Sequence, residues 1–365
     1  MRVLFVSCVP LQHAVTRYRC THLAEALRAA GHVADVTWIG APVIRIDHDI
    51  VVLHRICANC EGEALADAVR RSGATLIYGA DDLVFSEHVP NLPAEVLSFA
   101  GLHHAMLCRA DIALLSTQFL AEAACGITSN VDVIGNFPSA SLNTPSPAEG
   151  VALSGAGGAN EGEFTVGYFS GSKTHDADLA TIEAPLAAFL SENRERVRLR
   201  VVGPVMVPKA VKSIGAAIER LPAVPWAELP ALIAGCHVNL APLASSPLND
   251  GKSAIKWQEA ALARVATVAS PMGEFSQAID HGKDGLLCAT EDEWYAALKL
   301  LLLDPVRRAE IVGAAFVAVH SLAEVRRARV PSVFENALPT GPTRPVTFRN
   351  PRGFAKSIAK KALKR

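Results

Sequence analysis

The sequence predicts an α/β protein built from two Rossmann-like domains in series. Short runs of β-branched residues alternate with amphipathic helical patterns from the first residue, and the alternation stops in a Ser-, Pro- and Gly-rich stretch before it restarts. This alternation is typical of a parallel sheet that helices cover on both faces. The chain has 365 residues, which is enough for two domains of about 150 residues each.

Each predicted domain follows from its own series of patterns. Residues 1–150 contain the strand patterns "VLFVS", "VADVTW", "DIVVLH", "TLIY", "IALLS" and "VDVIG", with helices expected over 17–30 and 61–71. Residues 138–163 read as an interdomain linker. Residues 151–338 contain "FTVGYF", "VRLRVVG", "HVNLAPL", "VATVAS" and "GLLCA", a helix over 177–190, a short helix near 228 and C-terminal helices after 304. Residues 339–365 form a basic tail.

Composition excludes several classes of protein. Half of the residues are hydrophobic, the formal net charge is -1, and no apolar run reaches the roughly 18 residues that a membrane span needs. The opening "MRVLFVSCVP" reads as a strand and not as a secretory segment, so we expect a cytoplasmic protein. We expect no nucleic-acid partner. The eight cysteines lie among apolar neighbours and predict free, mostly buried thiols. Cys57 and Cys60 form a C-x-x-C, but no second pair completes a zinc site. The remainder of the chain differs from a thioredoxin, so a redox function is not expected either.

The tail is the most strongly charged part of the sequence. From Arg344 to Arg365 there are eight Lys or Arg residues and no acid, and Phe354, Ile358 and Ala362 recur at helical spacing. This pattern fits a helix on an anionic membrane surface, or else a solvated terminus that frays.

A narrow charged stripe is predicted on one otherwise apolar helix. Lys252, Lys256 and Glu259 follow an Asn-Asp-Gly turn at spacings of four and three residues, so a continuous helix would place them within about 60° of one another. Half-buried charges are costly unless they are paired or bind a ligand. The stripe therefore fits either a phosphate-binding helix start or an ordinary Glu–Lys surface pair.

Polar loops also follow several predicted strands, where open α/β sheets bind their ligands. The loop after "FTVGYF" contains Lys173 and leads into a helix, an arrangement suited to phosphate, although a plain turn explains it equally well. The first domain offers candidate ligand-binding residues at the ends of its strands: Arg17, Arg19, Arg55, Asp81 and Asp82. The alternative is a surface role for Arg17 and Arg19 and a helix-cap or loop role for the two acids. The adjacent acids do not form an Asp-x-Asp metal motif. No G-x-G-x-x-G follows a strand, which excludes an NAD-dependent enzyme.

Three stretches of the sequence resemble a known enzyme family. "VGYFSGSKTHDAD", "NDGKSAIKWQEA" and "ARVATVASPMGEFSQAIDHGKDGLL" resemble the retaining glycosyltransferases of family 4, in particular a bacterial group 1 subset. The resemblance runs from the first strand to about Leu338 and is strongest from Phe164 to Leu287. It implies the GT-B fold, in which two Rossmann-like domains face each other across a cleft, with an acceptor domain first and a nucleotide-sugar donor domain second.

The resemblance also implies roles for residues of the second domain. Glu259 matches the acid that contacts the nucleotide ribose, and Lys173 and Lys252 are the candidates for stabilising the departing diphosphate. The other donor-side candidates are Gly171, Ser172, His175, Ser253 and Lys256. The family pattern has a Glu where Gly251 stands and an Arg where Tyr168 stands. No metal or other cofactor is required by the resemblance.

The implied activity is transfer of a sugar from a nucleotide sugar to an acceptor hydroxyl, with retention. The implied setting is bacterial envelope polysaccharide or glycolipid synthesis by a hexosyltransferase-type enzyme. The expected partners are a glycan or lipid-linked glycan acceptor and, through the tail, the inner face of the plasma membrane. The alternative is an inactive nucleotide-sugar-binding or scaffold protein, which the departures at Gly251 and Tyr168 favour.

Overall fold

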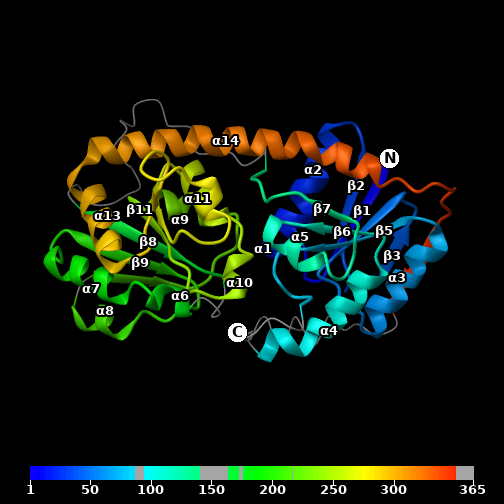
Figure 1. The fold of residues 1–365 in the computed structure, drawn as a ribbon, viewed down its shortest axis with the longest axis horizontal. Coiled ribbons are helices and arrows are strands. Elements are labelled where there is room, and N and C mark those ends of the chain that lie inside the picture. Colours follow the sequence, from blue (N-terminus) through cyan, green and yellow to red (C-terminus); the bar gives the residue numbers. More distant parts are fainter. Residues whose placement is uncertain (87–93, 140–162, 172–175, 216, 351–365) are drawn as a thin grey trace. The chain divides into compact units, whose positions relative to one another are not determined.

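The computed structural model describes residues 1–86, 94–139, 163–171, 176–215 and 217–350 (Figure 1). The chain divides into two compact units, Met1–Ser139 together with the residues from Glu324 onward, and a second unit that ends at Ala323. Residues 324–338, which the sequence pattern assigned to the second domain, therefore group with the first unit.

The first unit is built on a six-stranded parallel sheet in the order β2-β1-β4-β5-β6-β7. All five residues of β4 are buried, because helices cover both faces of a parallel sheet. A separate antiparallel ribbon joins β3 to β14. The strands are β1 (Arg2–Ser7), β2 (Val33–Trp38), β3 (Val43–Ile46), β4 (Ile50–His54), β5 (Thr75–Ala80), β6 (Ile112–Leu115), β7 (Val131–Val133) and β14 (Val346–Arg349).

The helices of the first unit follow the strands in sequence. Helix α3 begins at an Asn59 side chain that caps Gly62 and ends at Gly73, whose φ of 79° suits only glycine well. The helices are α1 (Ala14–Thr16), the π-helical turn η1 (Arg17–Thr21), α2 (His22–Ala29), α3 (Cys60–Ser72), α4 (Ala94–Arg109) and α5 (Gln118–Ala124).

The long helix α14 (Pro305–Asn336) belongs to both units, as its orange ribbon in Figure 1 shows. Its last turns pack on the first unit, where the rings of Phe334 and Phe5 meet edge to face with centroids 5.7 Å apart.

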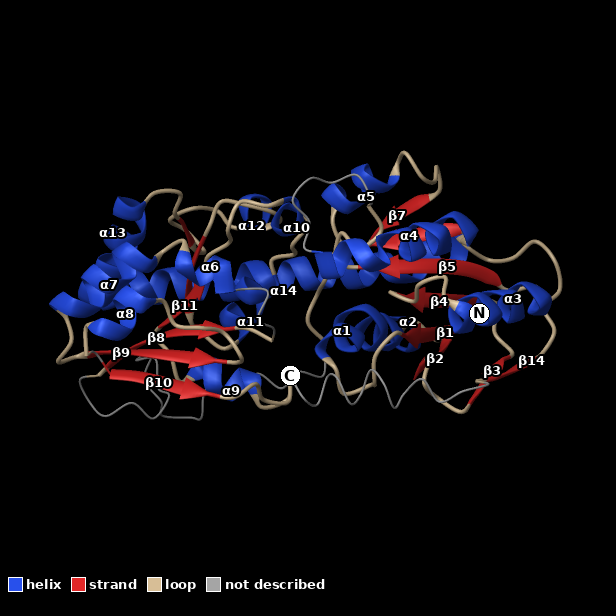
Figure 2. Cartoon of the chain, turned by 90° about the horizontal axis from the view of Figure 1, so that it is seen from below, coloured by secondary structure: helices blue, strands red, loops and turns tan. Residues whose placement is uncertain are grey.

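The second unit repeats the architecture of the first. Its six parallel strands run in the order β10-β9-β8-β11-β12-β13, as the red arrows of Figure 2 show in part. Every residue of β8 is buried. The strands are β8 (Phe164–Phe169), β9 (Val197–Val202), β10 (Ala217–Leu221), β11 (Val238–Ala241), β12 (Ala266–Ala269) and β13 (Leu286–Leu287).

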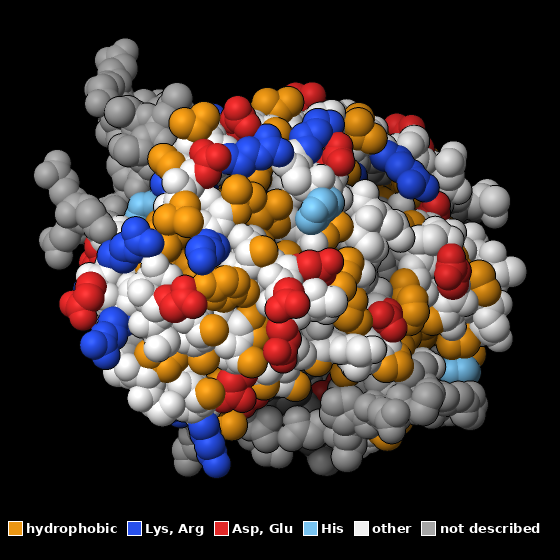
Figure 3. Space-filling model, turned by 60° about the vertical axis from the view of Figure 1, so that its left-hand side comes forward, with side chains coloured by type: hydrophobic (Ala, Val, Ile, Leu, Met, Phe, Trp, Pro, Cys, Tyr) orange, Lys and Arg blue, Asp and Glu red, His pale blue; other side chains and the backbone are white. Residues whose placement is uncertain are grey.

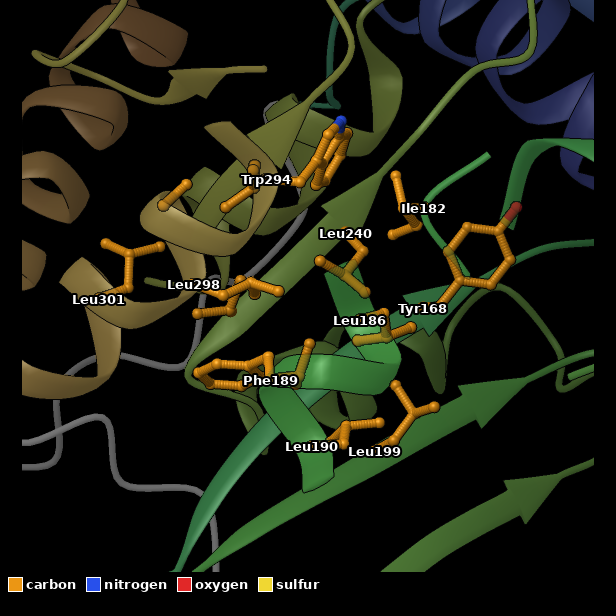
Figure 4. Packing of buried hydrophobic residues seen from close by; sticks show 14 of the residues in the cluster. Tyr168, Ile182, Leu186, Phe189, Leu190, Leu199, Leu240, Trp294, Leu298 and Leu301 are labelled. Carbon is orange, nitrogen blue, oxygen red and sulfur yellow. The ribbon is translucent and has the colours of Figure 1, made fainter. Parts of the chain in front are cut away.

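Helices pack on both faces of this second sheet. One face carries the largest core cluster of the unit, in which Leu186, Phe189 and Leu298 pack against Leu199 and Leu240 (Figure 4). The other face packs Phe169 and Val202 against Ile233 and Ala260. The helices are α6 (Asp176–Ala180), α7 (Glu183–Glu192), α8 (Lys209–Ser213), α9 (Leu229–Ala234), α10 (Pro247–Asp250), α11 (Ile255–Leu262), α12 (Phe275–Ala278) and α13 (Glu291–Leu303).

Two predicted helices differ from those observed. The helix expected over 177–190 is two helices, because Thr181 turns back and donates its hydroxyl to the Asp178 carbonyl at 2.7 Å. The helix expected to carry the charged stripe begins only at Ile255, after α10 has ended at Gly251. Lys252 therefore lies in the turn between two helices, and the prediction that it shares a helix with Lys256 and Glu259 is wrong.

The described surface gives no sign of a membrane span. Within the described ranges, no helix combines the length and the apolar character that crossing a bilayer would require. On the face in Figure 3, Lys and Arg side chains are interspersed with Asp and Glu. Exposed charges of both signs at this spacing keep the field over that face small.

Candidate functional site

The second unit brings several predicted donor-side residues to the carboxyl edge of its sheet. Strand β8 ends at Phe169 and leads to Ser170 and Gly171, and Gly171 is exposed with open space where a Cβ would lie. Gly203, at the end of β9, has a φ of 111°, and a Cβ there would lie 1.8 Å from the Ser170 carbonyl oxygen. Only glycine permits this close approach, which fixes the start of the loop.

Ser172, Lys173 and His175 lie outside the described residues, so their predicted roles stay predictions.

The turn between α10 and α11 is held by the loop after β12. The Glu274 carboxylate accepts the Ala254 N–H at 2.8 Å, and the Glu274 N–H donates to the Lys252 carbonyl at 3.0 Å. Gly273 has a φ of 55° and packs against the same carbonyl. Since the methyl group of Ala254 cannot accept a hydrogen bond at the start of α11, the Glu274 carboxylate from another loop satisfies the Ala254 N–H. The sequence pattern assigned no role to Glu274.

Lys256 carries a buried ammonium group in the first turn of α11. Its Nζ is shielded from solvent, has no hydrogen-bond partner among the described residues, and lies 4.5 Å from the centroid of the Tyr168 ring. The pKa of Lys256 is lowered to about 8, mainly by burial; Asp178 and Glu259 oppose this shift, and the charge of Lys252 contributes to it. A cation over an aromatic face gains about 0.5–2 kcal/mol, which replaces only part of the lost hydration.

Tyr168 lies at the border of the hydrophobic core. In Figure 4 its ring closes one side of the cluster and its hydroxyl points away from the labelled aliphatic side chains. Burial raises the pKa of Tyr168 well above its usual value, and Asp178 and Asp176 add to the effect. The phenol is therefore neutral, and among the described residues the positive charge that lies beside it is that of Lys256.

Asp178 is a buried residue that sequence reasoning did not single out, although it ends the quoted stretch "VGYFSGSKTHDAD". Its Oδ1 accepts hydrogen bonds from the Ala244 N–H at 2.8 Å and from Asn249 Nδ2 at 2.7 Å. These bonds tie α6 to the segment between β11 and α10. The second Asp of the H-D-A-D stretch was the available signal.

The remaining predicted donor-side residues lie at the start of α11 or on it. Ser253 precedes α11 and is half-buried, and Glu259 is half-buried one turn after Lys256. The structure thus brings Lys252, Ser253, Lys256 and Glu259 together in one unit with Gly171.

The first unit gathers a second set of polar groups at the carboxyl ends of β4 and β5. Arg55 Nη1 lies 3.0 Å from Asp82 Oδ2 and 3.4 Å from Asp81 Oδ1, and His54 Nε2 lies 3.4 Å from Asp81 Oδ1. Burial alone would raise the pKa of Asp81, but Arg55 and His54 outweigh it and hold the pKa well below its usual range. Arg55 has a φ of 52°, which is rare for a residue with a side chain.

The alternative that Arg17 and Arg19 are surface residues is wrong. Both are buried, because the π-helical turn directs them into the unit. Arg17 Nε donates to His22 Nε2 at 3.3 Å, and Arg19 Nη1 donates to the Ile134 carbonyl at 2.6 Å. Arg19 therefore supports the segment after β7, and Arg17 contacts His22 at the start of α2.

The cysteines and possible metal ligands form no further site. All eight cysteines are free, as predicted, but the prediction that most of them are buried is wrong. Three are buried, two are half-buried and three are exposed: Cys20, Cys236 and Cys288; Cys8 and Cys57; Cys60, Cys108 and Cys125. The described parts of the chain contain no group of three or more His, Cys, Asp or Glu side chains placed to hold a metal ion.

The comparison with known sequences concerns the second unit. Residues 165–304 match a family model described as glycosyl transferases, group 1. The match extends from β8 to the end of α13 and includes Tyr168, Asp178, Lys256 and Glu259. No curated protein sequence matches the chain at the significance required.

Solved structures resemble almost the whole chain. The structure of the Anabaena protein HepE in complex with UDP-glucose gives a TM-score of 0.63 at 14% identity, covering 92% of this chain and 100% of that one. Sucrose-phosphate synthase from Thermosynechococcus elongatus gives 0.62 at 13%, covering 92% and 99%. A glycosyltransferase from Rickettsia africae gives 0.60 at 11%, covering 93% and 100%. The expected GT-B fold, with two Rossmann-like domains, is confirmed.

Proposed function

We propose that this glycosyltransferase, whose residues 165–304 belong to the group 1 glycosyl transferases, moves a sugar from a nucleotide-sugar donor to a hydroxyl of a glycan or lipid-linked glycan. The observation that carries the proposal is the Lys256 ammonium group, which is buried over Tyr168 without a hydrogen-bond partner among the described residues. A charge in such a place is costly unless a ligand completes its surroundings. A diphosphate is a ligand of the required sign.

The proposed chemistry is transfer with retention. The bond from the donor sugar to the diphosphate loosens, and the sugar develops oxocarbenium character while the acceptor hydroxyl attacks from the same face. Lys173 and Lys252, together with Lys256, stabilise the negative charge that grows on the departing diphosphate. Glu259 accepts hydrogen bonds from the ribose hydroxyls, and Gly171, Ser172, Ser253 and His175 complete the donor side. No metal ion is part of this proposal.

The proposed setting is envelope polysaccharide or glycolipid synthesis in a bacterium. The basic tail favours it, because an acceptor attached to a lipid is reached best by an enzyme held at the membrane. The Anabaena neighbour was solved in complex with UDP-glucose, which favours a UDP-sugar as the first donor to test.

A nucleotide-sugar-binding protein without turnover is the second candidate. Gly251, at the end of α10, stands where the family pattern has a Glu, and Tyr168 stands where it has an Arg. Measured transfer to any acceptor, or hydrolysis of the donor, would exclude this candidate.

The donor side is tested with a panel of UDP-, GDP- and TDP-sugars in thermal-shift and calorimetric titrations. We expect one nucleotide class to bind, and Glu259→Ala to weaken that binding tenfold or more, because each charge-assisted bond to a ribose hydroxyl contributes about 1.5–3 kcal/mol. Glu310→Ala is the matched control, since that carboxylate is exposed and pairs with Arg307. A folded parent that binds no member of the panel would contradict the proposal. Unchanged affinity in Glu259→Ala would contradict only the ribose role.

A further inference from the structure

Tyr78 and His103 form a hydrogen-bonded pair in the first unit. The Tyr78 hydroxyl oxygen lies 2.9 Å from His103 Nδ1, and this bond joins β5 to α4. The Tyr78 side chain is fully buried, whereas His103 is half-buried. The sequence pattern assigned a role to neither residue.

Two features of the backbone place His103 beside the predicted ligand-binding residues of this unit. The Ala58 N–H, in the loop that carries Arg55, donates at 2.9 Å to the carbonyl of Leu102, which precedes His103. Strand β5, which carries the hydrogen-bond partner of His103, leads directly into Asp81. The ring therefore belongs to the same edge of the sheet, at the carboxyl ends of β4 and β5.

The burial of Tyr78 decides which ring nitrogen of His103 carries the proton. Burial raises the pKa of Tyr78 well above its usual value, against the influence of Arg55, so the phenol keeps its proton. A buried O–H without an acceptor is costly, and His103 Nδ1 is the acceptor that the described residues provide. The O–H is therefore the donor and Nδ1 the acceptor, which leaves the N–H of a neutral ring on Nε2.

The surroundings also keep the His103 ring neutral. Burial lowers its pKa to about 4, and Arg55 and His54, from the end of β4, contribute to the shift. A second proton, on Nδ1, would also break the hydrogen bond from Tyr78. Because Nδ1 faces a fully buried residue and the ring is half-buried, Nε2–H is the end of the ring that a ligand can reach.

We propose that His103 binds the acceptor sugar as an uncharged hydrogen-bond donor, through its Nε2–H, at the edge that also holds Arg55, Asp81 and Asp82. This inference rests on the proposed function, since it takes the first unit as the acceptor side. The carboxylates of Asp81 and Asp82 only accept hydrogen bonds, whereas a sugar hydroxyl both donates and accepts. His103 supplies a donor to this edge and brings no charge with it.

The tautomer is tested by nitrogen NMR on the full chain with isotopically labelled histidines. We expect the His103 ring to carry its proton on Nε2, and none on Nδ1, from about pH 5.5 to 8. Tyr78→Phe should let the other tautomer appear, because Nδ1 loses its donor. His103→Gln identifies the signals by their loss. A proton on Nδ1 in the parent, or titration of the ring near pH 6.5, would overturn the inference.

Binding is tested in the same spectra with methyl glucoside, methyl galactoside and methyl mannoside, each with and without UDP. We expect at least one glycoside to shift the His103 Nε2–H signal. His103→Phe should weaken its binding about tenfold, as loss of one hydrogen bond would. His103→Gln keeps an N–H donor and should lose less than about threefold. If no glycoside moves the signal, or if both variants lose the same affinity, the proposed role is wrong.

His104→Phe is the matched control for the substitution. His104 follows His103 on α4 and points about 100° away around the helix, so its replacement should leave glycoside binding unchanged. A loss as large as that of His103→Phe would show that the helix, and not the Nε2–H, governs binding. If His103→Phe does not fold, the tautomer and the response of the parent signal to the glycosides still decide the question.

Failure of the proposed function gives a different result. In that case the parent chain would bind no UDP-, GDP- or TDP-sugar, whatever the His103 signal shows. Nucleotide-sugar binding by a chain whose His103 signal responds to no glycoside would overturn the acceptor inference alone.

Discussion

At the scale of single residues, the informative feature is an uncompensated charge. Lys256 could have reached solvent from the first turn of a helix, yet its ammonium group is buried over Tyr168. A lysine without a ligand normally extends its ammonium group into water. A lysine in a buried ion pair has a carboxylate within hydrogen-bond distance. Neither applies to the contacts described for Lys256. The Tyr168 ring and the nearby acids offset only part of the cost of its burial, which is why we propose a ligand for it.

The pH dependence of nucleotide binding tests this residue. The pKa of Lys256 is lowered to about 8, mainly by burial, so the free protein loses the proton as pH rises through that value. A nucleoside diphosphate prefers the protonated form, so we expect its affinity at pH 8 to be about half of that at pH 7 and to fall further at higher pH. Calorimetry of the parent from pH 6.5 to 9.5 measures the profile.

The matched variants for this test are Lys256→Met and Lys283→Met. Lys256→Met should bind the diphosphate about tenfold more weakly at pH 7, because a charge-assisted hydrogen bond contributes about 1.5–3 kcal/mol, and its profile should be flat through pH 8. Lys283 is exposed and pairs with Asp280, so its substitution should leave the profile unchanged. An unchanged profile in Lys256→Met would rule out Lys256 as the titrating group.

Sequence spacing predicted the site residues only in part. The pattern placed Glu259 and Lys256 correctly on one helix, because the apolar positions of α11 continue to Leu262. It placed Lys252 on the same helix, since spacing alone does not show that α10 ends at Gly251. The burial of Arg17 and Arg19 could not be foreseen. The partner of Arg19 lies more than 110 residues away, and Arg17 reaches His22 only because the chain forms a π-helical turn, which spacing does not predict.

At the scale of elements, tertiary contacts position the short helices around the donor side. α6 and α10 have only five and four residues, too few to be stable alone. The buried Asp178 carboxylate joins them by accepting from the Ala244 N–H and from Asn249. These bonds set where α10 ends and thus where the turn at Lys252 begins.

Removal of this carboxylate should loosen both helices. We expect Asp178→Ala to lower the free energy of unfolding by about 2–3 kcal/mol, since a buried backbone N–H and an amide lose a charged acceptor. Asp280→Ala removes an exposed carboxylate from the same unit and should cost less than about 1 kcal/mol. Urea unfolding followed by far-UV circular dichroism measures both. Equal losses in the two variants would show that the Asp178 bonds do not hold these elements.

Elements with strong local patterns were predicted, and those that depend on distant partners were not. Strands β1, β4, β5 and β8 lie where apolar runs indicated them, because each is buried in the middle of a parallel sheet. The ribbon of β3 and β14 joins residues about 300 positions apart, and its alternating pattern is too short to signal a strand by itself.

At the scale of the whole molecule, the two-domain organisation was evident because the βα alternation occurs twice in the sequence. The division of α14 between the units was not, since a helix of 32 residues has the same local pattern on either side of residue 324. The chain returns to the first unit through this helix, and its last described strand, β14, pairs with β3. Arg344 donates from its N–H to the Ser72 carbonyl, and Asn350 Nδ2 donates to the Ile39 carbonyl.

These contacts decide where the basic tail can be removed without damage to the fold. Residues 344–350 belong to the first unit, so a truncation that tests the tail should keep Asn350 and delete only residues 351–365. The deleted segment has six Lys or Arg residues and no acid, and the predicted apolar positions Phe354, Ile358 and Ala362 lie within it. The structure of this segment lies outside the described residues, so membrane binding stays a prediction.

We expect the full-length chain to sediment with vesicles that contain phosphatidylserine at low salt, and to be released at high salt. Each positive charge near an anionic leaflet contributes about 1 kcal/mol, which screening removes. The chain that ends at Asn350 should remain in the supernatant and unfold at the same temperature as the parent. A variant with the six tail cations changed to Gln separates charge from apolar insertion. Equal sedimentation of the full-length and truncated chains would contradict a membrane role for the tail and would leave the donor site unaffected, because every residue proposed for that site precedes residue 260.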